Sequence, residues 1–459
     1  MTDGIRGRVV IVEAGAPVRR HAVIELDGGR IAGVRDATAE DDGPVYDVVL
    51  PGLVDAHSHA RGVPLACHGV GDGPLERFLL EMRALTPLPA ADEALVAGAA
   101  ALATGITSVQ AIYHTFADAA QYALGAAAVA DGYLSAGLRA FIALGLTDQD
   151  EFVPGAADSG STSRDMLTPR RGVTPGAFPA LAAGLLGTRG LVSIDAVGPV
   201  APQWCSDRAL RAIAEVGGAT RLHAHLLESA RQRLAPADPL ARLARAGLLS
   251  ARCSFAHGVW LDARQIDRVA AAGATIVHCP GSNARLADAT CPVRRLIDAG
   301  VPVALGLDSH GAVAEPDAFA EMRLALRMAA RAGAPLTAAE VLALATTGGA
   351  AAVARRDLGT LRPGAAADIV AVNLPEAATA ADPVEDLVIR AGPANVAATW
   401  VAGRPARQAR AAAAARVRLA AALADDAAAR AERVAEAQAA WEAADRGWRE
   451  LEARGRVGA

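Results

Sequence analysis

Eight short apolar runs alternate with helix-like stretches along the middle of the chain, and this alternation constrains the fold more than any other feature. The stretches between the runs are rich in Ala, Leu and Arg, for example residues 89–103, 207–217 and 263–272. Strands that alternate with helices predict a parallel sheet, and eight such units predict a (β/α)8 TIM barrel of the α/β class. The expected strands span residues 48–54, 106–113, 138–146, 191–197, 221–225, 253–260, 274–278 and 301–307.

Two β-rich pieces flank this alternation, one near each end of the chain. Short apolar strands joined by glycine-containing turns are indicated at residues 8–13 and 21–34, and again at 368–374 and 395–404. We therefore predict a small β-sandwich domain built from both chain ends, the barrel, and a C-terminal helical extension. Their expected bounds are residues 1–48 with 358–405, residues 49–357, and residues 406–459.

The C-terminal extension and one long loop carry further local signals. Val434, Trp441 and Trp448 recur every seven residues, which predicts an apolar stripe docked on the protein's own surface or on a partner subunit. Residues 149–175 are rich in Ser, Thr, Gly, Pro and Arg. A loop of this length is either a functional lid or a mobile segment.

Composition argues against several classes of function. The 459 residues carry a formal net charge of -5 without a basic run, so we expect no nucleic-acid surface. No apolar stretch reaches the length that spans a bilayer, and the first residues lack the layout of a secretory signal. The five cysteines form no CxxC pair, which indicates reduced thiols in a cytoplasmic protein rather than disulfides or a thiolate zinc site.

Histidines gather at the predicted carboxyl ends of the barrel strands, which form the functional face of a TIM barrel. His57 and His59 share strand parity and therefore point the same way. A lone histidine on a strand is usually structural, but several strands that place histidines at one rim indicate a metal site, because imidazole and carboxylate bind divalent metals. Seven of the ten histidines lie at this rim: His57, His59, His223, His225, His257, His278 and His310.

Five motifs in barrel order resemble those of the amidohydrolase superfamily, and more narrowly those of its cytosine deaminase and chlorohydrolase branch. Another segment, LGTLRPGAAADIV (358–370), is similar to the strand by which such chains return to their small β domain. The resemblance covers residues 8–404 and implies a metal-dependent hydrolase that acts on C–N bonds other than peptide bonds. The motifs are PGLVDAHSH (51–59), HLLE (225–228), AHG (256–258), HCPGSN (278–283) and GLD (306–308).

The resemblance implies a role for each motif residue. One divalent metal ion, Zn2+ in the first place and Fe2+ in the second, would be held by His57, His59, His225 and Asp308. Glu228 would move protons onto the leaving group, a cationic His257 would polarise the substrate, and Asp308 would also accept the proton of the attacking water. The candidate substrate contacts are His278, His310, Arg61 and Trp204.

Several of these choices stay open at the level of sequence. His223 and His225 have the same strand parity, and only the HxxE spacing to Glu228 favours His225 as the ligand. His310 lies in a DSH run similar to that of formiminoglutamate deiminases, but a surface role is as well supported. A structural role is equally open for Trp204 and is favoured for Arg61.

The chain contains no lysine, because all 45 basic residues are arginine. Several branches of the superfamily bridge two metal ions through a carboxylated lysine on the fourth strand, and this chain cannot do so. Centres that bridge two ions through Glu or Cys stay open but are disfavoured, so we expect a centre with a single metal ion, as in the deaminases.

We accordingly expect an aminohydrolase that cleaves an exocyclic C–N bond of a nitrogen heterocycle, of purine, pyrimidine, pterin or triazine type, and releases ammonia. One alternative is a formimino or amidine deiminase, or a chlorohydrolase, on the same scaffold. Another is an inactive barrel that serves as a binding or assembly protein. The expected partner is a small-molecule substrate, with neither nucleic acid nor membrane, and the protein is expected to form a homo-oligomer, a dimer or larger.

Overall fold

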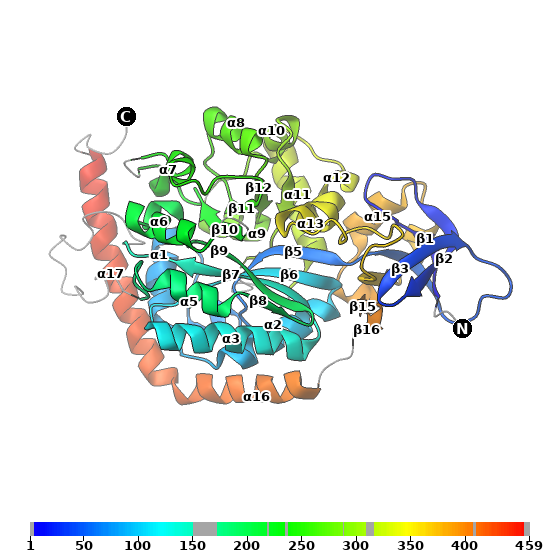
Figure 1. Ribbon diagram of the computed structural model, residues 1–459, viewed down its shortest axis with the longest axis horizontal. Helices are drawn as coiled ribbons and strands as arrows, with labels where there is room; N and C mark the ends of the chain where they lie inside the picture. The colour runs from blue at the N-terminus through cyan, green and yellow to red at the C-terminus, as the bar shows by residue number, and fades with distance from the viewer. Residues whose placement is uncertain are drawn as a thin grey trace.

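The computed structural model describes residues 4–149, 172–217, 220–234, 237–287, 289–308, 316–406 and 410–453, with the backbone alone at residues 234 and 447–453. It shows a central β/α body, a small β-rich part that holds the first strands, and two C-terminal helices along one side (Figure 1). The expected architecture of a TIM barrel, a small β part built from both chain ends and a C-terminal helical extension is confirmed.

The barrel is one parallel sheet whose strands follow one another in chain order, apart from the short β8 (Gly187–Arg189), which adds antiparallel to β9. A bridge between Ser58 and Asp308 brings the end of the last strand to the end of the first, and the Asp308 N–H donates to the His57 carbonyl at 2.7 Å. The strands are β5 (Leu53–Ser58), β6 (Ile106–Tyr113), β7 (Arg139–Leu146), β9 (Val192–Pro199), β10 (Arg221–Leu226), β11 (Cys253–His257), β12 (Thr275–His278) and β13 (Val303–Leu305).

Helices cover the outside of this sheet, and several begin at a side chain that satisfies the first free N–H groups. Asp118, Ser206, Asp262 and Thr337 each accept a hydrogen bond from the backbone three residues further on. The helices are α1 (Leu75–Glu81), α2 (Ala90–Ala103), α3 (Ala119–Ala136), α5 (Phe178–Leu185), α6 (Asp207–Glu215), α7 (Pro239–Arg245), α8 (Ala263–Ala272), α9 (Pro280–Leu286), α10 (Val293–Asp298), α11 (Ala318–Arg331), α12 (Ala338–Ala343) and α13 (Gly349–Ala352).

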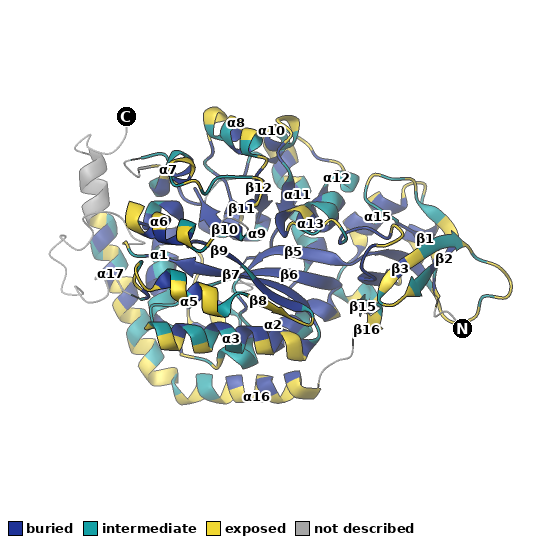
Figure 2. Ribbon diagram, in the orientation of Figure 1, coloured by how far each residue is buried: buried dark blue, intermediate teal, exposed yellow. Residues whose placement is uncertain are grey.

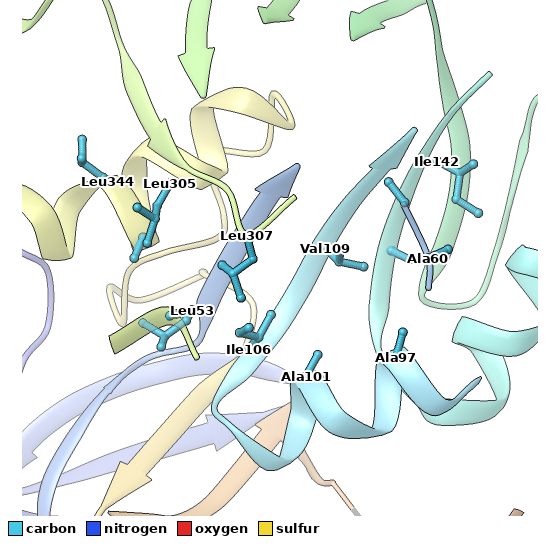
Figure 3. Close-up of a cluster of buried hydrophobic side chains, with 14 of the residues drawn as sticks. Leu53, Ala60, Ala97, Ala101, Ile106, Val109, Ile142, Leu305, Leu307 and Leu344 are labelled. Carbon is cyan, nitrogen blue, oxygen red and sulfur yellow. The ribbon is translucent and has the colours of Figure 1, made fainter. Parts of the chain in front are cut away.

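The main core lies between the strands and the helices. The barrel strands are buried along almost their whole length, whereas the helices are buried on one side only (Figure 2). Figure 3 shows how Ile106 and Val109 of β6 lie beside the alanines of α2, Ala97 and Ala101. Small side chains on this helix let it pack closely against the barrel strands.

A second, seven-stranded mixed sheet is built from both chain ends. In this sheet β4 pairs with β14 across more than 300 residues of sequence, so the chain ends are joined by backbone hydrogen bonds. Two short helices, α14 (Pro375–Thr379) and α15 (Pro383–Arg390), lie between its last strands in sequence. The strands, in sheet order, are β16 (Arg404–Pro405), β15 (Val396–Val401), β14 (Ile369–Val372), β4 (Val45–Pro51), β1 (Ile5–Val10), β2 (Arg19–Asp27) and β3 (Arg30–Asp36).

The single strand predicted at residues 48–54 is wrong, because the structure divides it between the two sheets. β4 ends at Pro51 in the small sheet, and β5 begins at Leu53 in the barrel. Gly52 lies between them, where a Cβ would stand 2.1 Å from the Thr107 Oγ1 of β6. The absence of a side chain therefore lets the chain pass from one sheet to the other. The domain bounds predicted from sequence stay a prediction.

The C-terminal extension forms two helices, α16 (Arg410–Asp425) and α17 (Ala427–Ala453). Arg418 of α16 forms an ion pair with Asp92 of α2 at 2.5 Å, and α17 packs against α1 (Figure 1). The predicted stripe thus docks on the protein's own surface at Trp441, while the Trp448 side chain lies outside the described residues. Most of the predicted 149–175 loop also lies outside them. Within the described parts of the chain, no helix is long and apolar enough to cross a bilayer.

Candidate metal centre and active site

Four side chains from different barrel strands converge at the carboxyl ends of the strands. His57 of β5, His225 of β10, His257 of β11 and Asp308 after β13 each offer a ligand atom, and these atoms all lie within 4.8 Å of one another. All four residues are buried. Three imidazoles and a carboxylate are a donor set that binds zinc and iron.

His59 borders the same cluster from the end of β5. Its Nε2 lies 3.2 Å from the Asp308 Oδ1 and 3.2 Å from the His225 Nε2. The structure therefore brings together all four predicted ligands, and it adds His257 to the same small volume. The cluster itself holds three imidazoles and one carboxylate, and His59 adds a fourth imidazole at its edge.

The buried atoms in this cluster fit a divalent ion. Nε2 of His57 and Nε2 of His257 have no hydrogen-bond partner among the described residues. Burial lowers the pKa of His57 to about 4, so its ring is neutral near pH 7 and has a lone pair to offer. Although burial opposes ionisation of Asp308, its contacts with His57 and His59 hold its pKa well below the usual range. An ionised carboxylate among neutral imidazoles is the charge balance that a cation requires.

Each inner imidazole is oriented by a contact at its outer nitrogen. The His225 Nδ1 lies 2.7 Å from the Val200 carbonyl oxygen, and the His57 Nδ1 lies 2.8 Å from the His223 Nε2. The His257 Nδ1 lies 2.9 Å from the Asn283 Oδ1. These contacts direct Nε2 of the rings toward the common centre, as outer partners of metal-binding histidines do.

The structure places His223 and His225, which strand parity leaves equivalent, in different surroundings. His225 lies in the cluster, whereas His223 lies behind His57. The His223 Nδ1 in turn lies 2.8 Å from the Ser254 Oγ and 3.0 Å from the Gln110 Nε2. His223 thus belongs to a buried polar network that supports the first strand.

Glu228 lies beside the cluster, two residues after the end of β10. Its Oε2 is 3.5 Å from the His257 Nε2, and its backbone N–H donates to the Gln232 Oε1 at 2.6 Å. Burial, together with the nearby charges of Asp308 and Glu76, raises the pKa of Glu228 well above its ordinary value. A carboxyl group with a raised pKa holds a proton that it can deliver to a leaving group.

Backbone strain is concentrated at the same strand ends. The non-glycine residues Ala60, Leu227, His257 and Asp308 adopt positive φ angles of 56°, 47°, 74° and 59°. Conformations of this kind cost about 1–3 kcal/mol each and persist only where the surrounding packing imposes them. The orientation of His257 and Asp308 at this rim therefore lowers the stability of the fold.

The predicted substrate contacts differ in their surroundings. His278 at the end of β12 is buried, with its Nδ1 3.4 Å from the Asn283 Nδ2, and burial lowers its pKa to about 3. Arg61 lines a cavity of about 250 Å³ that also borders His59 and His114. Trp204 packs in an apolar cluster with Leu65, Leu286 and others. His310 lies outside the described residues.

Three supporting residues were not singled out from sequence. Of the three, Asn283 was the easiest to find from sequence, because it ends the HCPGSN motif. It lies in the first turn of α9, and its side chain contacts His257. Gln110 is a fully buried amide in the middle of β6. Val200 contributes only its backbone carbonyl, which no residue type reveals.

Comparison with known proteins agrees with this geometry. The Amidohydrolase family matches residues 48–406, and the chain belongs to that family. A 5-methylthioadenosine/S-adenosylhomocysteine deaminase of Moorella thermoacetica is 30% identical over 359 residues, which is 76% of this chain and 78% of that protein. The family resemblance predicted from sequence is thereby confirmed.

Two further relatives define how far the similarity extends. A 5-methylthioadenosine/S-adenosylhomocysteine deaminase of Teredinibacter turnerae is 34% identical, but the match spans 45% of this chain and only half (50%) of that protein. The crystal structure of an adenosine deaminase from Xanthomonas campestris with bound zinc superposes with a TM-score of 0.75 and 27% identity, over 94% of this chain and 98% of that one. Their names agree with the predicted aminohydrolase chemistry on a nitrogen heterocycle.

Proposed function

We propose that the protein is a metal-dependent aminohydrolase that removes the exocyclic amino group of a nitrogen heterocycle and releases ammonia. The observation that carries the proposal is the convergence of His57, His225, His257 and Asp308 on one point with Glu228 beside it. All three relatives described above are named as deaminases of adenosine compounds, which favours a purine substrate among the heterocycles considered.

The metal ligands in this proposal are His57, His59, His225 and Asp308, and the ion is zinc, with iron(II) as the second choice. A bound divalent ion supplies Lewis-acid chemistry that lets water act as a nucleophile near neutral pH. Asp308, ionised and 3.4 Å from His57, accepts the proton that the attacking water loses. His278, Arg61, Trp204 and His310 are the proposed substrate contacts.

Glu228 and His257 complete the proposed proton transfers. Burial raises the pKa of Glu228 and so favours its protonated form, from which it delivers a proton to the nitrogen that leaves as ammonia. His257 contacts the reacting atoms through Nε2. Burial lowers its pKa and so favours the neutral ring over the cation expected from sequence, which makes Nε2 a hydrogen-bond acceptor for the attacking water.

A second candidate keeps the same residues but changes the substrate. A formimino deiminase or a chlorohydrolase needs the same activated water and the same proton donor, and the DSH run at residues 308–310 favours the deiminase over the chlorohydrolase. An inactive barrel is less well supported, because the ligand cluster and Glu228 are both present. A cytoplasmic location and a homo-oligomeric state remain predictions.

The deciding experiment measures metal content and product release on the same preparation. We expect about one equivalent of zinc or iron per chain, and ammonia from an adenine nucleoside in a screen of amino-heterocycles, formimino compounds and chlorotriazines. Chloride from a chlorotriazine, or ammonia from a formimino compound but from no amino-heterocycle, would replace the aminohydrolase by the corresponding alternative. Protein that binds no divalent metal, and gains no activity when metal is added, would leave only the inactive barrel.

A further inference from the structure

The C-terminal helix α17 contacts the segment that follows Glu228. Arg231, three residues after Glu228, donates through its NH2 group to the Asp445 Oδ1 at 2.9 Å. The guanidinium of Arg231 also lies over the ring of Trp441, 5.1 Å from its centroid. Both partners lie on α17, beyond residue 406 where the family match ends. A part of the chain outside the family match therefore reaches the edge of the site.

The same segment is held from a second side by α1. The Ser229 Oγ donates to the Glu76 Oε1 at 2.6 Å, and Glu76 also lies 3.8 Å from the Arg231 guanidinium. Helix α1 itself packs against α17, where Leu80 contacts Ala440 and Ala444. The two helices thus form one unit around the turn that carries Glu228.

Within the turn, the contacts run directly to the backbone of Glu228. The Gln232 Oε1 accepts hydrogen bonds from the N–H groups of Glu228 at 2.6 Å and of Ser229 at 3.4 Å. The Gln232 N–H in turn donates to the Ser229 Oγ at 3.3 Å. Arg231 stands between Ser229 and Gln232, so a constraint on Arg231 is a constraint on the position of Glu228.

The ion pair is placed where it can exert such a constraint. The side chains of Arg231 and Asp445 are only 19% and 17% exposed, so water screens their attraction less than that of a surface pair. An arginine that is both paired with a carboxylate and stacked on an aromatic ring loses most of its freedom to reorient.

We propose that Asp445 and Trp441 are positioning residues, and that α17 fixes the 228–232 turn and thereby places the Glu228 carboxyl group against the reacting atoms. This inference rests on the proposed function, since it uses the role of Glu228 as proton donor. Misplacement of a catalytic group by about 1 Å can cost a factor of about 100 in rate. The Glu228 carboxyl lies 3.5 Å from His257, so a modest shift would separate them.

The kinetic test compares variants of α17 in the full-length, metal-loaded protein. Asp445→Ala and Trp441→Leu should lower kcat by about tenfold or more, with KM and metal content unchanged, while Asp445→Glu should keep most of the activity. Arg418→Ala is the matched control, because it breaks the ion pair that holds the same extension to Asp92, far along the chain from the Glu228 turn. Equal kcat values for Asp445→Ala and Arg418→Ala would overturn the inference.

Amide hydrogen exchange provides a measurement that does not depend on turnover. Exchange at residues 228–232 should rise in Asp445→Ala and in Trp441→Leu, and should stay at the wild-type level in Arg418→Ala. Unchanged exchange in the α17 variants would overturn the inference even if kcat falls. If the wild-type protein releases ammonia from no heterocycle, the proposed function fails, and the exchange data still decide whether α17 fixes the turn.

Discussion

At the scale of single residues, three of the imidazoles at the site are each held at the outer nitrogen. Val200, His223 and Asn283 hold His225, His57 and His257, respectively. A ring held at its outer nitrogen keeps one tautomer and one orientation, so the inner nitrogens meet at a point before any ion binds. Glu228 differs from these residues, because burial raises the pKa of its carboxyl group well above the ordinary value and so favours the protonated form.

Substitution of Glu228 separates metal binding from catalysis. Glu228→Gln keeps the shape and the hydrogen-bonding capacity of the side chain but cannot deliver a proton. We expect normal metal content by elemental analysis and a fall in kcat of about 100- to 10,000-fold. Retention of turnover by the variant would show that another group protonates the leaving nitrogen.

His278 gives the stability of the protein a defined dependence on pH. Burial, and next to it the charge of His257, lowers the pKa of His278 to about 3, below the ordinary value of 6.5. The unfolded chain therefore binds a proton that the folded chain rejects. Its stabilising contribution is complete above pH 6.5 and is lost as the pH falls from 6.5 toward 3, by about 1.4 kcal/mol per pH unit.

The replacement His278→Gln should remove this component. Urea unfolding at several pH values between 6 and 4 should give a free energy of unfolding that falls less steeply in the variant than in the wild type, by up to about 1.4 kcal/mol per pH unit. Identical slopes would mean that His278 takes up its proton without unfolding.

At the scale of elements, the position of the site depends on where each strand ends. The register that pairs Leu226 of β10 with His257 of β11 sets Glu228 and His257 at adjacent strand ends. The strained residues His257 and Asp308 then turn the chain out of the sheet. Gly52 has a comparable role at the start of β5, where it permits close contact with β6.

A side chain at Gly52 should therefore disturb the first barrel strand. In Gly52→Ala the new Cβ would meet the Thr107 side chain at 2.1 Å, and we expect a loss of about 1–3 kcal/mol in the free energy of unfolding. Gly184→Ala is the control, because no atom lies within 4 Å of its Cβ position and α5 should gain up to about 1 kcal/mol from the change. Equal stability of the two variants would contradict the steric argument.

At the scale of the whole molecule, the barrel and the small sheet are joined by a buried ion pair. Arg139, the first residue of β7, donates to both carboxylate oxygens of Asp368 at 2.8 and 2.9 Å. Asp368, just before β14, also accepts from the Ala402 N–H at 2.8 Å. The side chains are 10% and 3% exposed, so neither charge is well solvated once its partner is removed.

The replacement Arg139→Met leaves the Asp368 charge buried without its main partner. We expect a loss of about 3–5 kcal/mol in the free energy of unfolding, measured with urea. The surface pair Arg19 and Asp36, with side chains 43% and 81% exposed, offers the control, and Arg19→Ala should cost less than about 1 kcal/mol. A loss of similar size for both would show that the buried pair does not join the two sheets energetically.

The sequence by itself determined the barrel, the rim that bears the site, and the family. Alternation of strands and helices repeats a local pattern, and the topology of a parallel barrel brings every strand end to one rim. His57, His59, His225 and Asp308 could therefore be predicted as neighbours without any knowledge of distances. The absence of lysine excluded a metal centre bridged by a carboxylated lysine, because no arrangement of the chain can restore a missing functional group.

Only the tertiary structure decided which groups touch. It placed His223 behind His57 rather than in the cluster, brought His257 in among the ligands, and divided the predicted first strand at Gly52. It also revealed the contact between Arg231, three residues after Glu228, and Asp445 of α17. These facts depend on register, on the packing of small against large side chains, and on contacts between residues more than 200 positions apart. Local sequence patterns do not show which residues distant in the chain are in contact, so these contacts could be read only from the tertiary structure.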